Sequence, residues 1–203
     1  MITIHNFDRG IRGQRVAWQC EEMGLAWRPE VFPYPSPPEY RAKYPPGSVP
    51  FLEDEGGVGM GESVAMMIYL AQRYGPTPLL PIEPAAMART LQLAVFSEAV
   101  LGGLMNPLIG ASFMAPEDQT ANWTHGFCQS RVSDGLGYAA SLLGEAAFFV
   151  GGDLTLADIA ISTTLGMWEG ALGHEIPAPL AAHRERMMAR PAYGRAAARL
   201  SAP

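Results

Sequence analysis

Residues 44–52 read YPPGSVPFL, and residues 61–70 read GESVAMMIYL. The first segment closes a proline-rich stretch, in which missing amide hydrogens and fixed φ angles disfavour regular structure. Its apolar end predicts a strand over 49–53, and a pair of glycines then predicts a tight turn to a return strand over 58–60. A helix is predicted over 62–73, because apolar residues recur there on one face. Together the two segments predict an antiparallel strand pair that leads into a helix.

The residues before this stretch predict further mixed structure. Alternating apolar residues indicate a short strand over 2–7, and a helical stripe follows over 13–24, with a glycine at its end as a C-cap. A second strand is expected within 25–32, and the proline-rich connector after it holds at most a short helix around 39–43. The predicted order up to about residue 75 is therefore β-α-β-irregular-β-β-α.

The remainder of the chain is predicted to be helical. A proline-rich stretch, GPTPLLPIEP, separates it from the mixed part. Helical segments are expected near residues 85–112, 117–143, 155–170 and 178–199. Mixed elements followed by a run of helices indicate an α/β unit and an all-α unit. The predicted domains are residues 1–76, a linker over 77–84, and a helical domain over 85–203.

A capping box is predicted at the start of the third of these helical segments. The side chain of Thr155 is expected to cap the amide of Asp158, and the Asp158 carboxylate to reach back to residue 155. Leu154 and Ile159 stand at the positions of a hydrophobic staple. We therefore expect Asp158 to act in folding and not as a catalytic acid.

Composition excludes several classes of protein. The chain has 203 residues, 48% of them hydrophobic and 17% charged, which is enough apolar material for a folded core. The formal net charge of −6 argues against a nucleic-acid binder, which needs a basic surface. The two cysteines, Cys20 and Cys128, are far apart and match no disulfide or zinc pattern, so no metal is expected.

The sequence also carries an expectation about location. The first residues lack a positive leader followed by an apolar run, which is unlike a secretory signal. The longest apolar candidate, residues 91–113, is interrupted by polar residues, proline and several glycines, so no membrane span is expected. We expect a cytoplasmic protein that contacts neither membrane nor nucleic acid.

Three segments resemble the glutathione S-transferase family: residues 44–52, residues 61–70 and residues 155–160, which read TLADIA. The segments occur in the family's order and spacing over nearly the whole chain. The resemblance implies a thioredoxin-like N-terminal domain and a C-terminal helical bundle. It also implies glutathione as co-substrate, a small apolar electrophile as the second substrate, and a homodimer.

The resemblance assigns the glutathione-binding residues. A cis peptide bond before Pro50 would turn the backbone of Val49 outward to pair with the cysteinyl part of the tripeptide. The alternative is a trans proline that opens an edge strand. The hydroxyl of Ser63, at a helix start that favours anions, would meet the γ-glutamyl carboxylate, and Glu62 would meet its ammonium group. The alternative for both residues is a simple helix cap.

The family's usual thiol activator is missing. Its members use a tyrosine at the end of the first strand, or a serine or cysteine just before the first helix, whereas here Asn6 and Gly10 stand at those positions. The remaining helpers are the Asn6 amide, the backbone amides of residues 11–13, and a nearby guanidinium, for which Arg12 is preferred over Arg9. The alternative is that the arginines of this region are solvated surface charges: Arg9, Arg12 and Arg15.

Three functions follow from these residues. The first is a transferase-like enzyme, or a related isomerase, dehalogenase or lyase, that uses the glutathione thiolate on a small apolar electrophile. The second is a non-catalytic or weakly catalytic binding protein that keeps the fold without the usual activator. The third, a thiol-disulfide reductase, is disfavoured because Cys20 comes too late to stand at the start of the first helix.

Overall fold

The computed structural model describes residues 1–8 and 10–201. The described residues divide into two compact units. The first comprises residues 1–8, 10–80 and 188–201, and the second comprises residues 81–187. The predicted succession of a mixed α/β unit and a helical unit is confirmed.

The first unit is built on a mixed sheet in which the described strands lie in the order β2-β1-β3-β4. Strand β1 (Ile2–Phe7) pairs in parallel with β2 (Trp27–Phe32) and antiparallel with β3 (Phe51–Asp54). Strand β4 (Val58–Met60) returns along β3 through the predicted glycine turn, whose two glycines have φ angles of 88° and 80°. The parallel and antiparallel pairs together give the thioredoxin-like arrangement.

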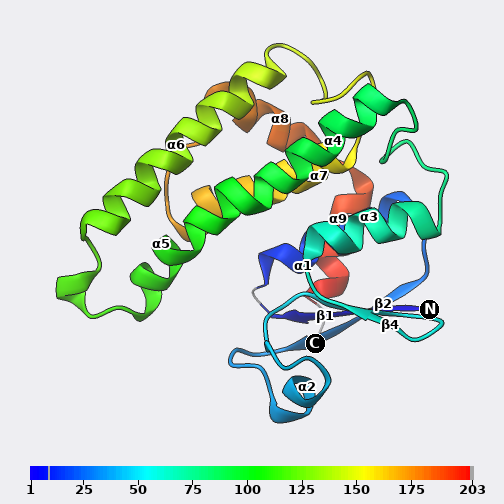
Figure 1. Cartoon of the computed structure of the whole chain (residues 1–203), viewed down its shortest axis with the longest axis horizontal. Coiled ribbons are helices and arrows are strands. Elements are labelled where there is room, and N and C mark those ends of the chain that lie inside the picture. Colours follow the sequence, from blue (N-terminus) through cyan, green and yellow to red (C-terminus); the bar gives the residue numbers. More distant parts are fainter. Residues whose placement is uncertain (9, 202–203) are drawn as a thin grey trace. The chain divides into compact units, whose positions relative to one another are not determined.

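Helices cover both faces of this sheet. Helix α1 (Ile11–Glu22) packs on β1, and α3 (Ser63–Arg73) and α9 (Pro191–Leu200) pack on α1. Figure 1 shows these three helices on one side of the sheet and α2 (Pro38–Lys43) on the other. The fully buried side chains of the first unit are mostly apolar, with Ile4, Trp18 and Leu70 among them.

The second unit consists of helices. Helices α4 (Pro84–Phe96) and α5 (Gly103–Met114) are joined by a π-helical turn, η1 (Ser97–Gly102), and a short 3-10 turn, η2 (Glu117–Gln119), follows them. Next come α6 (Trp123–Leu143), α7 (Leu156–Gly166), a second π-helical turn, η3 (Met167–Ala171), and α8 (Ala178–Met188). Helix α4 packs on α7 and α5 packs on α6.

The helical run from Pro84 to Met114 confirms the predicted helical segment near residues 85–112 and contains the π-helical turn η1. By length and composition alone, this run is able to cross a membrane, and it is a single such run among the described residues. Its side chains Leu93, Leu101 and Met105 are fully buried within the second unit. Core helices of globular proteins pass the same length and composition test, and 39% of the tested window of this run is buried.

The expected helix over 178–199 is two helices in the structure. Helix α8 ends at Met188, and α9 begins at Pro191. Proline has no amide hydrogen to continue a helix but fits the first turn of a new one. The prediction of one continuous segment is therefore wrong at this point, and the proline that breaks it is visible in the sequence.

The predicted capping box at the start of α7 is confirmed. The Thr155 side chain caps the third residue of the helix, and Asp158 Oδ2 accepts hydrogen bonds from the Thr155 amide and hydroxyl, both at 2.9 Å. The other carboxylate oxygen accepts bonds from the Phe149 amide at 2.9 Å and from His183 Nε2 at 3.0 Å. Asp158 and His183 are fully buried, so this cluster holds the second unit together and no substrate reaches it.

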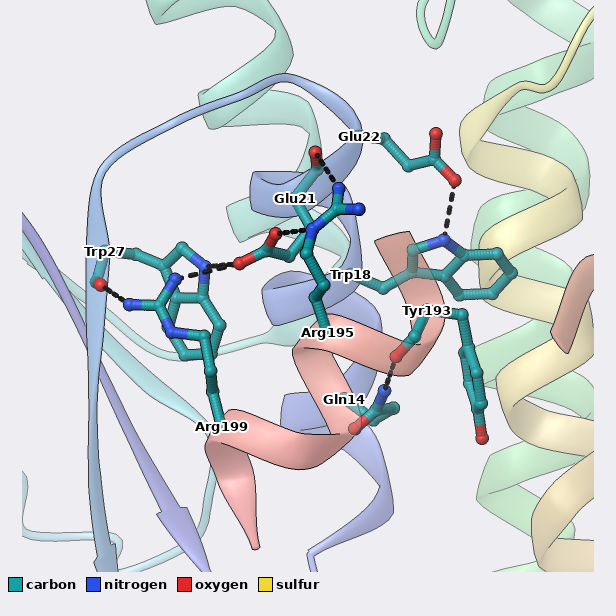
Figure 2. A network of polar contacts seen from close by, with 8 residues as sticks. All are labelled: Gln14, Trp18, Glu21, Glu22, Trp27, Tyr193, Arg195 and Arg199. Carbon is teal, nitrogen blue, oxygen red and sulfur yellow. Dashed lines mark hydrogen bonds and ion pairs between the residues drawn. The ribbon is translucent and has the colours of Figure 1, made fainter. Parts of the chain in front are cut away.

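The end of the chain belongs to the first unit, although the sequence placed it in the helical domain. The reason is a set of ion pairs between α9 and α1, shown in Figure 2. Glu21, at the end of α1, accepts from Arg195 Nε at 2.7 Å and from Arg199 Nη1 at 2.8 Å. The indole of Trp27 donates to the same carboxylate at 2.9 Å, and the Arg199 guanidinium lies 4.0 Å from the Trp27 ring centre.

The neighbouring Glu22 adds a second tie. It accepts from Arg190 at 2.6 Å and 2.9 Å and from the Trp18 indole at 2.9 Å. Bidentate pairs between arginine and carboxylate are among the stronger ionic contacts in proteins. The two adjacent acidic residues therefore join the last helix to the first one.

We predict that Glu21→Ala lowers the free energy of unfolding by about 2 kcal/mol at neutral pH, since it removes charge-assisted hydrogen bonds from a side chain that is 11% exposed. Burial raises the pKa of Glu21, but hydrogen bonds from Arg195, Trp27 and Arg199 outweigh it, and the net pKa lies below its ordinary value. This stabilisation is therefore present above pH about 4.3 and is lost as the pH falls through the folded-state pKa.

Urea denaturation of wild type and variant between pH 7 and about pH 4 measures this difference. The exposed Glu145 of the second unit supplies the control, because Glu145→Ala is expected to change stability by less than about 0.5 kcal/mol. A Glu21→Ala variant as stable as this control would contradict the role of the ion pairs.

Candidate functional site

Asn6 is packed beneath the loop that joins β1 to α1. Its side chain is 2% exposed, and Nδ2 donates a hydrogen bond to the Gly10 carbonyl at 2.8 Å. The amide of Gly10 in turn donates to the Phe7 carbonyl at 2.9 Å. The Asn6 carbonyl oxygen Oδ1 is buried and accepts no hydrogen bond from the described residues. The first role of Asn6 visible in the structure is thus to hold this loop.

Two glycines make room for Asn6. A Cβ atom built on Gly10 would lie 2.3 Å from Asn6 Oδ1, and one built on Gly13 would lie 2.4 Å from Asn6 Cγ. Both distances are far below van der Waals contact, so neither position accepts a side chain while Asn6 keeps its place. This packing explains why position 10, where the family carries serine or cysteine, is glycine here.

The start of α1 offers backbone amides and one arginine. Gly10 is its N-cap, and within the described chain the helix has neither a side-chain cap at this end nor an acidic residue in its first turn. Arg12 lies in that turn and is half-buried. Arg9, the other predicted helper, lies outside the described residues. The assignments of Asn6 and Arg12 to catalysis stay predictions.

The segment before β3 lies at the same end of the sheet as Asn6. His5 is opposite Phe51 in the β1–β3 pair, so the next residues, Asn6 and Pro50, meet at that end. The peptide bond between Val49 and Pro50 is cis, as the resemblance implied and the alternative did not. Pro50 is buried and Val49 is half-buried.

Helix α2 supports the segment around Val49 from the other side. The Tyr40 hydroxyl donates to the Ser48 carbonyl at 2.6 Å, and Lys43 Nζ lies 2.9 Å from Glu53 Oε2. The same carboxylate oxygen lies 2.6 Å from Nε2 of the buried His5. These contacts tie the loop before β3 to the centre of the sheet.

The start of α3 has an unusual backbone. Glu62 has φ 64° and ψ 97°, and it is the one non-glycine residue with positive φ in the described part of the chain. Such a conformation is strained and is often found at functional sites. Glu62 is exposed, and its carboxylate makes no capping bond to the described amides of α3. Glu62 is thus the N-cap residue of α3 by position, but its side chain does not make a capping hydrogen bond to the described amides.

Ser63, the first residue of α3, is 3% exposed and accepts a hydrogen bond from Arg15 Nη1 at 3.3 Å. Arg15 itself is fully buried within the structure. The interpretation of Arg15 as a solvated surface charge is thus wrong. The sequence held no local signal for this burial, because the partner of Arg15, Ser63, lies 48 residues away in another helix.

The described residues hold no cluster of His, Cys, Asp or Glu able to bind a metal ion. Burial raises the pKa of the Cys20 thiol to about 12, with the Glu21 charge adding to the effect. A thiol with such a pKa stays protonated near neutral pH and is a poor nucleophile. Cys20 is therefore a core residue of α1, which argues against the reductase alternative.

We predict that Gly10→Ser destabilises the protein by about 2 kcal/mol, because the new Cβ would overlap Asn6 Oδ1. The second substitution Asn6→Ala is expected to recover more than half of that loss, since it removes the atoms that clash. Thermal unfolding of both variants measures this coupling. Gly126→Ser, at a helical position with open space around it, serves as the control and should leave stability unchanged or slightly raised. Additive losses in the double variant would overturn the packing argument.

Family models match both parts of the chain. The glutathione S-transferase N-terminal domain matches residues 5–78, and the glutathione S-transferase C-terminal domain matches residues 104–192. Among curated proteins, a glutathione S-transferase-like protein of Fusarium is 34% identical over 134 residues, which are 64% of this chain and 59% of the relative. The maleylacetoacetate isomerase of Pseudomonas aeruginosa is 31% identical over 128 residues, 60% of this chain and 57% of that enzyme. The chain thus spans less than two thirds of either relative.

Solved structures share the whole fold. The theta class glutathione S-transferase of Xanthomonas axonopodis pv. citri, solved with glutathione bound, has a TM-score of 0.81 at 27% identity and covers 97% of this chain and 96% of its own. The nitrogen regulation fragment of the yeast prion protein Ure2p has a TM-score of 0.86 at 20% identity, and the match covers 97% of this chain and 96% of that fragment. At this identity the likeness shows the fold alone. With both family models matched over most of its length, the chain belongs to the glutathione S-transferase family.

Proposed function

We propose that the protein binds reduced glutathione and uses its thiolate to conjugate or otherwise transform a small apolar electrophile. The observation that carries the proposal is the start of α3. There, the strained Glu62 and the buried Ser63 stand at a helix end whose free amides and positive dipole attract an anionic group. The structural relative from Xanthomonas, which has glutathione bound, supports the same ligand.

The tripeptide has groups that suit each part of this site. In our proposal the Ser63 hydroxyl donates to the γ-glutamyl carboxylate, and the exposed Glu62 carboxylate pairs with the γ-glutamyl ammonium group. The backbone of Val49, just before β3, pairs with the backbone of the cysteinyl residue as an added strand would. The thiol then lies near the end of β1 and the start of α1, because Pro50 and Asn6 meet at that end of the sheet.

Catalysis requires the thiolate. A free thiol with a pKa of about 8.5 is only a few per cent ionised at neutral pH, and lowering the pKa by two units needs about 2.7 kcal/mol of preferential thiolate stabilisation. We assign this effect to the amides that open α1, to the Arg12 guanidinium and to the Asn6 side chain. One hydrogen of Asn6 Nδ2 is used by the Gly10 carbonyl, so the second hydrogen is the one available to a thiolate.

A second function, glutathione binding with little or no catalysis, is favoured by one specific observation. The side chain of Asn6 occupies the space from which a serine or cysteine at position 10 would act, and its amide already holds the loop. A hydroxyl or thiol side chain at position 10 would therefore require Asn6 to move from its place. In this second reading the site keeps its ligand and leaves the thiol protonated.

We predict that glutathione binds and that its pKa in the complex falls to about 6.5. Calorimetry measures the binding, and the pH dependence of the ultraviolet absorbance of the thiolate gives the pKa. The variant Arg12→Ala should raise the pKa of the bound thiol by roughly half a unit or more, since a nearby positive charge favours the thiolate. Arg89→Ala, at an exposed site on α4, is the matched control and should leave that pKa unchanged.

Absence of binding would overturn the proposal altogether. Binding with the pKa of the thiol unchanged at about 8.5 would reject the enzymatic function and select the binding function. Equal effects of Arg12→Ala and Arg89→Ala would reject Arg12 as a helper while leaving the enzyme proposal in place.

We also propose that the chain forms a homodimer, with the N-terminal domain of one subunit facing the helical domain of the other, as the family resemblance implies. Exposed aromatic side chains on α6 support an assembly, because Trp123 is 79% exposed and stacks on Phe127. Light scattering is expected to give twice the chain mass at micromolar concentration. A monomer mass at every concentration would contradict this proposal.

A further inference from the structure

Two buried hydrogen bonds join α1 to α3 in register. Arg15 Nη1 donates to Ser63 Oγ at 3.3 Å, and Gln19 Nε2 donates to the Met67 carbonyl at 2.8 Å. The two donors are four residues apart on α1, and their acceptors are four residues apart on α3. Arg15 and Gln19 are both fully buried. The seam between these helices is therefore held at two successive turns by polar side chains of α1.

The two hydrogen bonds differ in whether their acceptor group is also able to contact a ligand. The Gln19 bond ends on a backbone carbonyl inside α3, where no ligand group is expected. The Arg15 bond ends on the hydroxyl that we assign to the γ-glutamyl carboxylate. The pair thus provides a comparison between a bond that only packs two helices and a bond that touches the proposed site.

The chemistry of arginine fixes the direction of the Ser63 hydrogen. A guanidinium has five donor hydrogens and no acceptor, so Ser63 Oγ must accept in this bond and cannot donate to Arg15. The serine has one hydroxyl hydrogen, which is then free to point toward an acceptor on another side. A carboxylate has only acceptor oxygens, so it matches a hydroxyl that is held in this orientation.

We propose that Arg15 is a positioning residue of the glutathione site, which makes the Ser63 hydroxyl a dedicated donor to the γ-glutamyl α-carboxylate. This inference rests on the proposed function, which supplies glutathione as the ligand. It goes beyond that function because it gives Arg15 a role in the site. Arg15 touches no reacting atom in this proposal. Its effect is on recognition of one carboxylate, because it sets the rotamer and the hydrogen-bond polarity of Ser63.

The test compares two ligands that differ at that carboxylate alone. The first is reduced glutathione, and the second is 4-aminobutyryl-cysteinyl-glycine, in which hydrogen replaces the γ-glutamyl α-carboxylate. Calorimetry gives the dissociation constants of both ligands for wild type and for each variant. The selectivity ratio is the dissociation constant of the analogue divided by that of glutathione. A hydrogen bond to a charged group corresponds to about tenfold or more in affinity, so the wild-type ratio is expected to exceed ten.

Arg15→Met removes the donor, and Arg15→Gln introduces an amide oxygen that can accept the Ser63 hydrogen. Both variants are expected to reduce the ratio about tenfold, as Ser63→Ala should. The double variant Arg15→Met with Ser63→Ala should lose no more selectivity than Ser63→Ala alone, because both changes remove the same contact. Arg15→Lys keeps a side chain with donors only and is expected to stay within about threefold of wild type.

Gln19→Met is the matched structural control. It breaks the neighbouring buried bond of the same seam, and its ratio of dissociation constants should equal that of wild type even if its stability falls. If Arg15→Met does not fold, the comparison of Arg15→Lys with Arg15→Gln decides the matter, because the first keeps the donor character and the second does not.

The possible outcomes distinguish the role of Arg15 from the binding of glutathione itself. An unchanged ratio in the Arg15→Met and Arg15→Gln variants, or a fall of equal size in Gln19→Met, would overturn the role of Arg15 and leave glutathione binding intact. A wild-type protein that binds neither ligand would instead overturn the proposed function. Wild-type binding of glutathione without preference over the analogue would remove the Ser63 subsite and the Arg15 proposal together.

Discussion

The hydrogen bond from Arg15 to Ser63 lies where α1 meets α3, and the geometry of the first unit depends on how α1 is held. Helix α1 buries apolar residues such as Val16 and Ala17. Toward α3 it presents Arg15 and Gln19, and its last turn presents two glutamates to the arginines of α9. A 12-residue helix with three packed sides has little freedom to rotate, because any rotation breaks contacts on every side at once.

This fixed helix places both ends of the candidate site. Its first turn faces Asn6 and the loop from β1, and Arg15, one turn later, reaches the start of α3. Taking an arginine out of water has a large desolvation cost, which its hydrogen bonds only partly offset, so a buried arginine is weak evidence for stability. Its presence beside Ser63 is better explained by the orientation it gives to that hydroxyl than by a contribution to the free energy of folding.

Much of the fold was predictable because the signals were local. Alternation, helical periodicity and glycine turns gave the order of elements in the first unit, and the Thr155–Asp158 spacing gave the capping box. The position of α9 was not predictable, because Glu21 and its partner Arg195 are 174 residues apart, and each charge reads by itself as a solvated one. Arg15 was misjudged for the same reason: its burial depends on Ser63, a partner in another helix.

The candidate site shows the same division between local and distant causes. The family resemblance could locate the residues that lie in contiguous motifs, which are Val49, Pro50, Glu62 and Ser63. The packing of Asn6 against Gly10 and Gly13 could not be located in this way, because sequence letters do not give the direction of a side chain. In the structure these three residues form one steric unit, because a side chain at position 10 or 13 would overlap the side chain of Asn6.

That steric unit narrows the ways in which a thiol can be activated here. A serine or cysteine at position 10 would need the space that Asn6 fills, and a tyrosine in place of Asn6 would have to fit a larger ring between two close-packed glycines. A serine or cysteine at position 10 would therefore require Asn6 to move or to be replaced by a smaller residue. The groups that remain are the backbone amides at the start of α1 and charges near that helix end. In the function we propose, the dipole of α1 and Arg12 would therefore take the place of the oxygen or sulfur atom that other family members use.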